Sequence, residues 1–245
     1  MESRTRTPAK ANRRSSAKAK PAVAQLLPFR ATHGGRRPGA GRKPTGDRAG
    51  IPHDTRAALA ARFPAHVTVK LREHLPALRR RDAYAALRTA FAAGCDRNGF
   101  RLIHYAVLND HLHFVVEAAD RRALSRGMQG LLVRIARTLN RHWKRRGRVF
   151  ADRYHDHILR SPREVRNALR YVLGNARHHA TEGRMVAVPQ AIDTYTSAPW
   201  FDGFRETIVV RGLQAVVRPV TDAHTWLLTI GWRRHGLLSV AERPA

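Results

Sequence analysis

The stretch Arg101–Ala118, RLIHYAVLNDHLHFVVEA, predicts two neighbouring strands of one sheet. Its two halves, Arg101–Leu108 and Leu112–Ala118, are rich in β-branched and aromatic residues, which favour strands. The polar tripeptide Asn109-Asp110-His111 joins them and is short enough for a tight connection between adjacent strands. This stretch therefore indicates a sheet in which consecutive strands pair, and the rest of the fold is interpreted around it.

Two histidines begin the second of these strands. Side chains alternate between the faces of a strand, so His111 and His113 point to one face, while Leu112 and Phe114 point to the other, toward the core. Two imidazoles on one face can share a metal ion. With 14 histidines in the chain, such a pair also arises by chance, so the spacing alone leaves metal binding open.

Hydrophobic periodicity outlines the elements on either side of this pair of strands. Strand-like runs and helix-like stripes alternate, and a serine-proline dipeptide marks one helix start. The expected elements are a strand over Val67–Leu71, a helix over Asp82–Arg97 ended by Asn98-Gly99, a helix over Arg121–Lys144, a strand over Val149–Leu159 and a helix opening at Ser161-Pro162.

The resulting order, β-α-β-β-α-β-α, predicts an α+β fold with an antiparallel-rich central sheet and helices packed on one side. Three regions are expected: a disordered basic arm over residues 1–60, a folded domain over 61–182 and a C-terminal extension over 183–245 that contacts DNA or docks a partner. Within the extension, Thr225–Gly236 is interpreted as a helix or an apolar patch.

Charge is the strongest compositional signal. The chain has 46 Lys and Arg against 18 Asp and Glu, a formal net charge of +28, which predicts a polyanionic partner, above all nucleic acid. No apolar run approaches the ~20 residues that span a bilayer, and no signal peptide is recognised, so no membrane association is expected. The single cysteine, Cys95, fits a reducing compartment, and we expect a cytoplasmic protein.

The basic arm contains one motif of its own. Residues 34–44, GGRRPGAGRKP, are similar to the Gly-Arg-Pro cores of AT-hook peptides, whose arginines enter narrow minor grooves. The residues expected to contact DNA there are Arg36, Arg37, Arg42 and Lys43. A nonspecific, solvated basic linker is the alternative interpretation.

A tyrosine and an asparagine share one flank of the last predicted helix. Tyr171 falls off the centre of the apolar stripe formed by Val165, Leu169 and Val172, and Asn175 follows one turn later. A hydroxyl and an amide oxygen therefore lie on the same side of this helix. By itself this pattern is also typical of an ordinary amphipathic helix.

Together these motifs resemble the HUH single-tyrosine transposases of the IS200-like superfamily, especially the REP-associated tyrosine transposases. The resemblance rests on Leu108–Val116, Val149–His157 and Tyr171–Asn175 and extends over roughly residues 65–180. The chain departs from these relatives in Ala176, where proline is frequent, in its basic arm and in its C-terminal extension. The resemblance implies an HUH, ferredoxin-like transposase fold.

The resemblance also implies a mechanism. Tyr171 would attack the scissile phosphate to form a 5′-phosphotyrosine, and His111, His113 and Asn175 would bind Mg²⁺ or Mn²⁺. Tyr154 remains open as an alternative nucleophile. Two further histidines, His104 and His157, remain open as alternative metal ligands.

The expected substrate is single-stranded or hairpin DNA, and the resemblance implies a homodimer, although some domesticated relatives act as monomers. Basic residues of the long helix would contact phosphates, and Trp143 would either stack on a base or fill the core. The residues are Arg134, Arg137, Arg141, Lys144, Arg145 and Arg146. Two rival functions are a noncatalytic nucleic-acid-binding regulator and a hydrolytic, metal-dependent nuclease.

Overall fold

The computed structural model describes residues 57–174, 192–210 and 212–242. The chain divides into two units, residues 1–45 and residues 46–245. The basic arm up to residue 56, with its AT-hook-like segment and Arg36, Arg37, Arg42 and Lys43, lies outside the described residues, and so does Asn175. The larger unit contains β1 (Ala65–Lys70), α1 (Arg81–Ala92), β2 (Asp96–Arg97), β3 (Phe100–Val107), β4 (His111–Ala118), α2 (Arg121–His142), β5 (His155–Ile158) and α3 (Pro162–Leu173).

The five strands form one antiparallel sheet in the order β2-β3-β4-β1-β5. Without the short β2, the chain runs β1-α1-β3-β4-α2-β5, which is the ferredoxin-like arrangement. The α+β prediction with an antiparallel central sheet is therefore confirmed. Strands β3 and β4 pair directly, as the sequence of this hairpin predicts.

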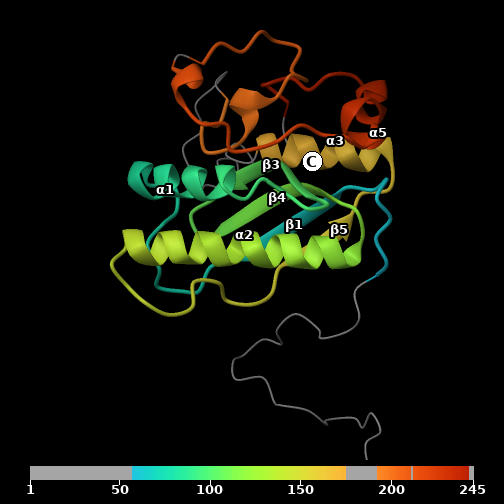
Figure 1. Cartoon of the computed structure of the whole chain (residues 1–245). Helices are drawn as coiled ribbons and strands as arrows, with labels where there is room; N and C mark the ends of the chain where they lie inside the picture. Colours follow the sequence, from blue (N-terminus) through green and yellow to red (C-terminus); the bar gives the residue numbers. More distant parts are fainter. Residues whose placement is uncertain (1–56, 175–191, 211, 243–245) are drawn as a thin grey trace, which may run out of the picture. The chain divides into compact units, whose positions relative to one another are not determined.

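Helices cover both faces of the sheet, so the prediction that they pack on one side is wrong (Figure 1). The helices α1 and α2 bury their apolar stripes against Val67, Leu102 and Phe114 on one face. On the other face, α3 packs against Ile103 and Val115. Both faces of a sheet covered in this way must be apolar, which explains why β3 and β4 read as nearly continuous hydrophobic runs.

Two predicted elements are shorter than their sequence patterns. Helix α1 ends at Ala92, and the residues up to Arg97 enter a β-hairpin in which Asn98-Gly99 is the turn, with Gly99 at a φ of +78°. The strand predicted over Val149–Leu159 is divided: Phe150 bridges Leu71, and the regular strand begins only at His155. A turn ends the first of these elements, and a bend at Ala151 and Asp152 interrupts the second.

Parts of the C-terminal ranges 192–210 and 212–242 pack on α3 and on the sheet. Trp232 is buried within the same apolar cluster as α3, near the short helices α5 (Trp226–Thr229) and η3 (Gly231–His235) that occupy the predicted helix or apolar patch. Arg166 donates to both carboxylate oxygens of Glu242, at 2.7 and 3.0 Å. Within the described residues, no helix is both long and apolar enough to cross a membrane.

Candidate active site

Strands β1 and β4 form the floor of the candidate site. Thr68 on β1 pairs with His113 on β4, and Lys70 pairs with His111, so these side chains lie on one face of the sheet. This is the face that α3 covers. Leu112 points to the opposite face and is fully buried there, which confirms the predicted alternation.

In both histidines of β4, Nδ1 is the ring nitrogen that makes the hydrogen bonds. Their ring centroids lie 4.9 Å apart. Nδ1 of His113 lies 3.0 Å from Oγ1 of Thr68 and 3.2 Å from Nε2 of His66, while Nδ1 of His111 lies 2.7 Å from Oδ1 of Asp110. A metal-binding histidine ligates through one nitrogen and hydrogen-bonds through the other. Because Nδ1 makes the hydrogen bonds in both rings, Nε2 is the expected ligand atom.

Asp110 is suited to orient His111. Partial burial acts to raise the pKa of this carboxyl, but the hydrogen bond with His111 and the charges of His111 and Lys70 outweigh it, so the pKa lies below its usual value. The ionised carboxylate accepts a hydrogen bond from Nδ1–H of His111. Such carboxylate–histidine pairs fix the tautomer and the orientation of a metal-binding ring.

Helix α3 brings Tyr171 to these histidines. The helix begins at Pro162, capped by Ser161, whose hydroxyl accepts a hydrogen bond from the backbone N–H of Glu164. Its buried stripe holds Tyr171 half-buried at one edge, as the sequence predicts. The Tyr171 ring centroid lies 5.1 Å from that of His113, with the rings nearly perpendicular. A potential nucleophile and a potential metal ligand are therefore in ring contact.

His66 is a site residue that the sequence analysis missed. It hydrogen-bonds His113 and contacts the Tyr171 ring edge-on, with centroids 5.9 Å apart. Burial, followed by the charges of His157 and His155, lowers the pKa of His66 to about 4, so the ring is neutral at neutral pH. The strand predicted from the sequence began only at Val67, so it did not include His66, and the pairing of β1 with β4 was not visible from local patterns.

The donor set partly fits the divalent cation expected from the resemblance. Two imidazoles converge with Nδ1 engaged, which suits ligation by Nε2. Among residues 57–174, 192–210 and 212–242, no group of three or more His, Cys, Asp or Glu residues could hold a metal. Asn175, the third ligand that the resemblance implies, is an amide and lies outside these ranges.

The alternative nucleophile lies on the wrong face of the sheet. Tyr154 belongs to the apolar cluster beneath α2 and is 7% exposed. Its neighbour Asp156 faces the same side and accepts a hydrogen bond from Arg121 of α2 at 2.6 Å. The structure therefore brings Tyr171 to His113 and places Tyr154 away from it.

The alternative metal ligands are also apart from the pair on β4. His104 is buried, with Nδ1 3.1 Å from Oγ of Ser197, and burial lowers its pKa to about 4. His157 on β5 is exposed, pairs across the sheet with His66, and lies 3.9 Å from Glu164.

The predicted DNA-contact residues of the long helix lie on the other side of the sheet. Helix α2 covers the face opposite Tyr171, and Trp143 packs against the core there. Arg145 donates a hydrogen bond to Asn140 at 2.8 Å. The remaining predicted contacts are partly or fully exposed on α2 and the turn after it: Arg134, Arg137, Arg141, Lys144 and Arg146.

Comparisons with known proteins concern the segment that carries this site. Residues 63–174 match the sequence model of the family described as "Transposase IS200 like". No curated protein matches the chain. A solved structure of a REP-associated tyrosine transposase bound to a REP hairpin is 17% identical, with a TM-score of 0.43, covering 55% of this chain and 76% of that chain. A protein from Deinococcus radiodurans R1 assigned as a transposase is 14% identical, with a TM-score of 0.36, covering 57% and 100%.

Proposed function

Because residues 63–174 match the sequence model of the IS200-like transposases, we propose that this protein cleaves and rejoins single-stranded DNA through a covalent bond to Tyr171. The observation that carries this proposal is the contact between Tyr171 and His113, whose ring centroids are 5.1 Å apart. The two residues are distant in sequence and come from different elements, α3 and β4. A transposase role follows from the family, while the tyrosine and the metal are proposed here.

The reaction is a transesterification. Oη of Tyr171 attacks the phosphorus, a P–O bond to tyrosine forms, and the bond to the 3′ oxygen breaks. The phenol loses one proton and the departing 3′ oxygen gains one, so no net proton is consumed. The DNA 5′ end stays attached as a phosphotyrosine, and attack by a 3′-hydroxyl reverses the step.

Tyrosine has a pKa of about 10 and needs activation at neutral pH. A bound Mg²⁺ or Mn²⁺ supplies positive charge that polarises the phosphate and offsets the charge that develops on it. His111 and His113 would hold the ion from β4, with Asn175 as the third ligand. Thr68 and Asp110 orient the two rings through Nδ1.

The net charge of +28 supports DNA as the partner. We propose a substrate with a short hairpin next to the cleavage site, as the family resemblance in the sequence implies. A homodimer is a prediction of the same resemblance.

The test uses the full-length protein with end-labelled single-stranded hairpin DNA and Mn²⁺ or Mg²⁺, run on a denaturing gel. We expect a metal-dependent covalent protein–DNA adduct with the wild type and with Tyr154→Phe, and none with Tyr171→Phe. The Tyr154 variant is the matched control because it removes the same hydroxyl on the opposite face of the sheet.

The other outcomes separate the rivals. An adduct that disappears only in Tyr154→Phe would transfer the nucleophile to that residue. Strand cleavage that survives Tyr171→Phe without any adduct would identify activated water and a hydrolytic nuclease. Binding without cleavage would identify a noncatalytic regulator.

A further inference from the structure

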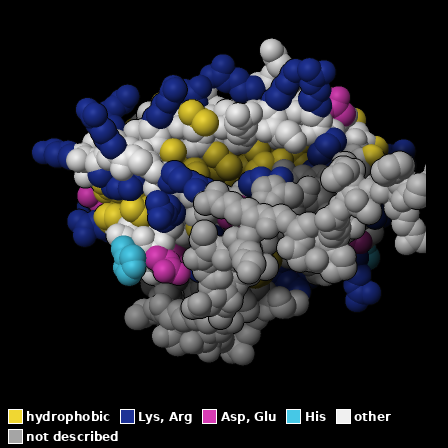
Figure 2. All heavy atoms as spheres, turned by 90° about the horizontal axis from the view of Figure 1, so that it is seen from below, with side chains coloured by type: hydrophobic (Ala, Val, Ile, Leu, Met, Phe, Trp, Pro, Cys, Tyr) yellow, Lys and Arg dark blue, Asp and Glu magenta, His cyan; other side chains and the backbone are white. Residues whose placement is uncertain are grey.

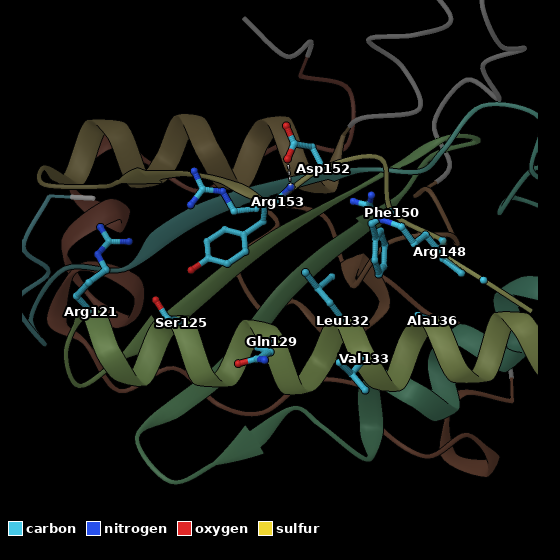
Figure 3. Close-up of a pocket in the computed structure, with 13 residues that line it drawn as sticks. Arg121, Ser125, Gln129, Leu132, Val133, Ala136, Arg148, Phe150, Asp152 and Arg153 are labelled. Atoms are coloured by element: carbon cyan, nitrogen blue, oxygen red, sulfur yellow. Dashed lines mark hydrogen bonds between the residues drawn. The ribbon is translucent and has the colours of Figure 1, made fainter. Parts of the chain in front are cut away.

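A second cavity lies on the face of the sheet opposite the candidate active site. It has a volume of about 770 Å³ and separates α2 from the segment 147–154. This is within the range of cavities that hold small-molecule ligands. Figure 3 shows that Leu132 of α2 and Phe150 of the opposing segment point toward each other across it.

The lining combines an apolar floor with a basic rim. Phe150 and Leu132 form the floor, and the rim includes Val133, which is 43% exposed although it is apolar. The polar side chains are Ser125, Gln129, Arg121, Arg148, Asp152, Arg153 and Tyr154. A planar aromatic ring, hydrogen-bonding groups and guanidinium groups are the chemistry that recognises a base and its phosphate.

The helix that forms one wall is unusually basic. α2 has six arginines and no acidic residue over its 22 residues, a length of about 33 Å. Only Arg121 forms a salt bridge, with Asp156, among the described residues. Within the part of the chain that the structure describes, the other five arginines of the helix form no salt bridge: Arg122, Arg126, Arg134, Arg137 and Arg141.

A neighbouring cavity of about 580 Å³ extends this basic surface. It lies between α2 and the β2–β3 hairpin and is lined by Arg97, Arg122, Arg126 and Arg134. Figure 2, which views the molecule from below relative to Figure 1, shows a band of hydrophobic side chains bordered by Lys and Arg side chains. The surface therefore offers phosphate contacts beside an apolar hollow.

The combination of arginines and an apolar cavity favours one kind of ligand over others. A second copy of the chain has the same net charge of +28, which disfavours its docking on this particular basic surface. A flat anionic membrane would satisfy the arginines but could not enter the cavity. Single-stranded DNA satisfies both features, because its bases are not paired and can stack on an aromatic side chain while its phosphates bind arginine.

We propose that the cavity between α2 and residues 147–154 binds unpaired bases of DNA, with Phe150 as the stacking platform and the α2 arginines as phosphate contacts. This inference rests on the proposed function, since it assigns a second contact to the same substrate. Because Tyr171 lies on the other face of the sheet, the second contact governs how tightly DNA binds and leaves the chemical step unchanged.

The test uses full-length Tyr171→Phe protein, which separates binding from cleavage, and mixed-sequence single-stranded oligonucleotides carrying 2-aminopurine at successive positions. Stacking quenches 2-aminopurine fluorescence.

We expect quenching at a confined set of positions, and we expect Phe150→Leu to abolish it. The same variant should bind DNA with an affinity reduced roughly 5- to 100-fold, the range for loss of one base–aromatic stack. Phe150→Leu keeps an apolar side chain in the core; a second variant, Val133→Glu, places a negative charge at an exposed position of the rim and should weaken binding similarly.

The arginines are tested by the salt dependence of the same binding. Arg126→Gln should reduce the slope of log affinity against log salt by about 0.7, the value for one phosphate contact on a single strand. The matched control is Arg234→Gln, an exposed arginine of η3 in the C-terminal layer, which should leave the slope unchanged. Equal slopes for Arg126→Gln and the wild type would overturn the phosphate contact.

The two proposals can fail separately. Unchanged quenching and affinity in both Phe150→Leu and Val133→Glu would overturn the base-binding cavity, even if the wild type still forms the Tyr171 adduct. Conversely, quenching that depends on Phe150 in a protein whose wild type never cleaves would support the cavity and contradict the proposed nuclease.

Discussion

Oγ1 of Thr68 lies 3.0 Å from Nδ1 of His113, across the antiparallel pair of β1 and β4. The threonine hydroxyl and Nε2 of His66 both face this nitrogen. The threonine hydroxyl can accept a hydrogen bond from Nδ1–H, and in that tautomer Nε2 carries the lone pair that a metal needs. Thr68 is therefore placed to favour the tautomer that the proposed metal site requires.

The first prediction concerns this hydroxyl. Thr68→Val keeps the shape of the side chain but removes the hydrogen bond, so we expect the Mn²⁺ affinity, measured by titration calorimetry on the full chain, to fall roughly 10- to 100-fold, as for other outer partners of metal-binding histidines. Thr68→Ser restores the hydroxyl and should retain near-wild-type affinity. Long-range ¹H–¹⁵N spectra of the metal-free protein should show a changed His113 tautomer in the valine variant only. Wild-type affinity and spectra in Thr68→Val would contradict this role.

The second prediction is a loss of stability in acid caused by His104. Burial lowers its folded pKa to about 4, whereas an unfolded histidine has a pKa of about 6.5. Between these values the unfolded chain binds a proton that the folded chain does not, so stability falls as pH decreases from 6.5 toward 4, by up to roughly 3 kcal/mol for this group.

Urea unfolding at pH 7 and pH 5 measures this effect. His104→Gln cannot titrate, and its amide can still bond Ser197, so its stability should differ less between the two pH values than that of the wild type. Comparing each protein with itself removes the direct cost of the substitution. An equal pH dependence in both proteins would show that His104 is not the group responsible.

The third prediction contrasts two glycines of α2. A Cβ at Gly127 would lie 2.1 Å from Cγ of the buried Phe100, whereas a Cβ at Gly130 would meet nothing within 4 Å. Gly127→Ala should therefore destabilise the protein by roughly 1–3 kcal/mol through overpacking. Gly130→Ala should stabilise it by about 0.5–1 kcal/mol, because alanine is the better helix former. Both changes in the free energy of unfolding are measured with urea. If Gly127→Ala stabilised the protein as Gly130→Ala does, α2 would not approach Phe100 this closely.

Much of this site could be anticipated from local patterns. The alternation in HLHFVV predicted that His111 and His113 share a face, and the stripe of α3 predicted Tyr171 at its edge; both placements are confirmed. These predictions succeed because one strand or helix repeats its side-chain directions regularly, whatever surrounds it. The metal and the role of Tyr171 as nucleophile remain predictions.

Other features depended on contacts between segments remote in the chain. His66 and His113 are 47 residues apart, and only the register of β1 against β4 joins them. The sequence left Tyr154 open as an alternative nucleophile, because it did not say which helix would cover that side of the sheet. Likewise, the arginines of α2 were visible as a basic helix, but the cavity beside Phe150 was not.

The sequence by itself thus determined the order of the main strands and helices, the shared face of the histidine pair and the basic character of α2, because each follows from the regular spacing of nearby residues. Only the tertiary structure decided that α3 covers one face of the sheet and α2 the other. This arrangement places Tyr171 beside the histidines and Tyr154 on the other face of the sheet. The physical reason is that packing both apolar faces of the sheet is a property of the whole chain, set by which surfaces bury each other, and no local periodicity encodes it.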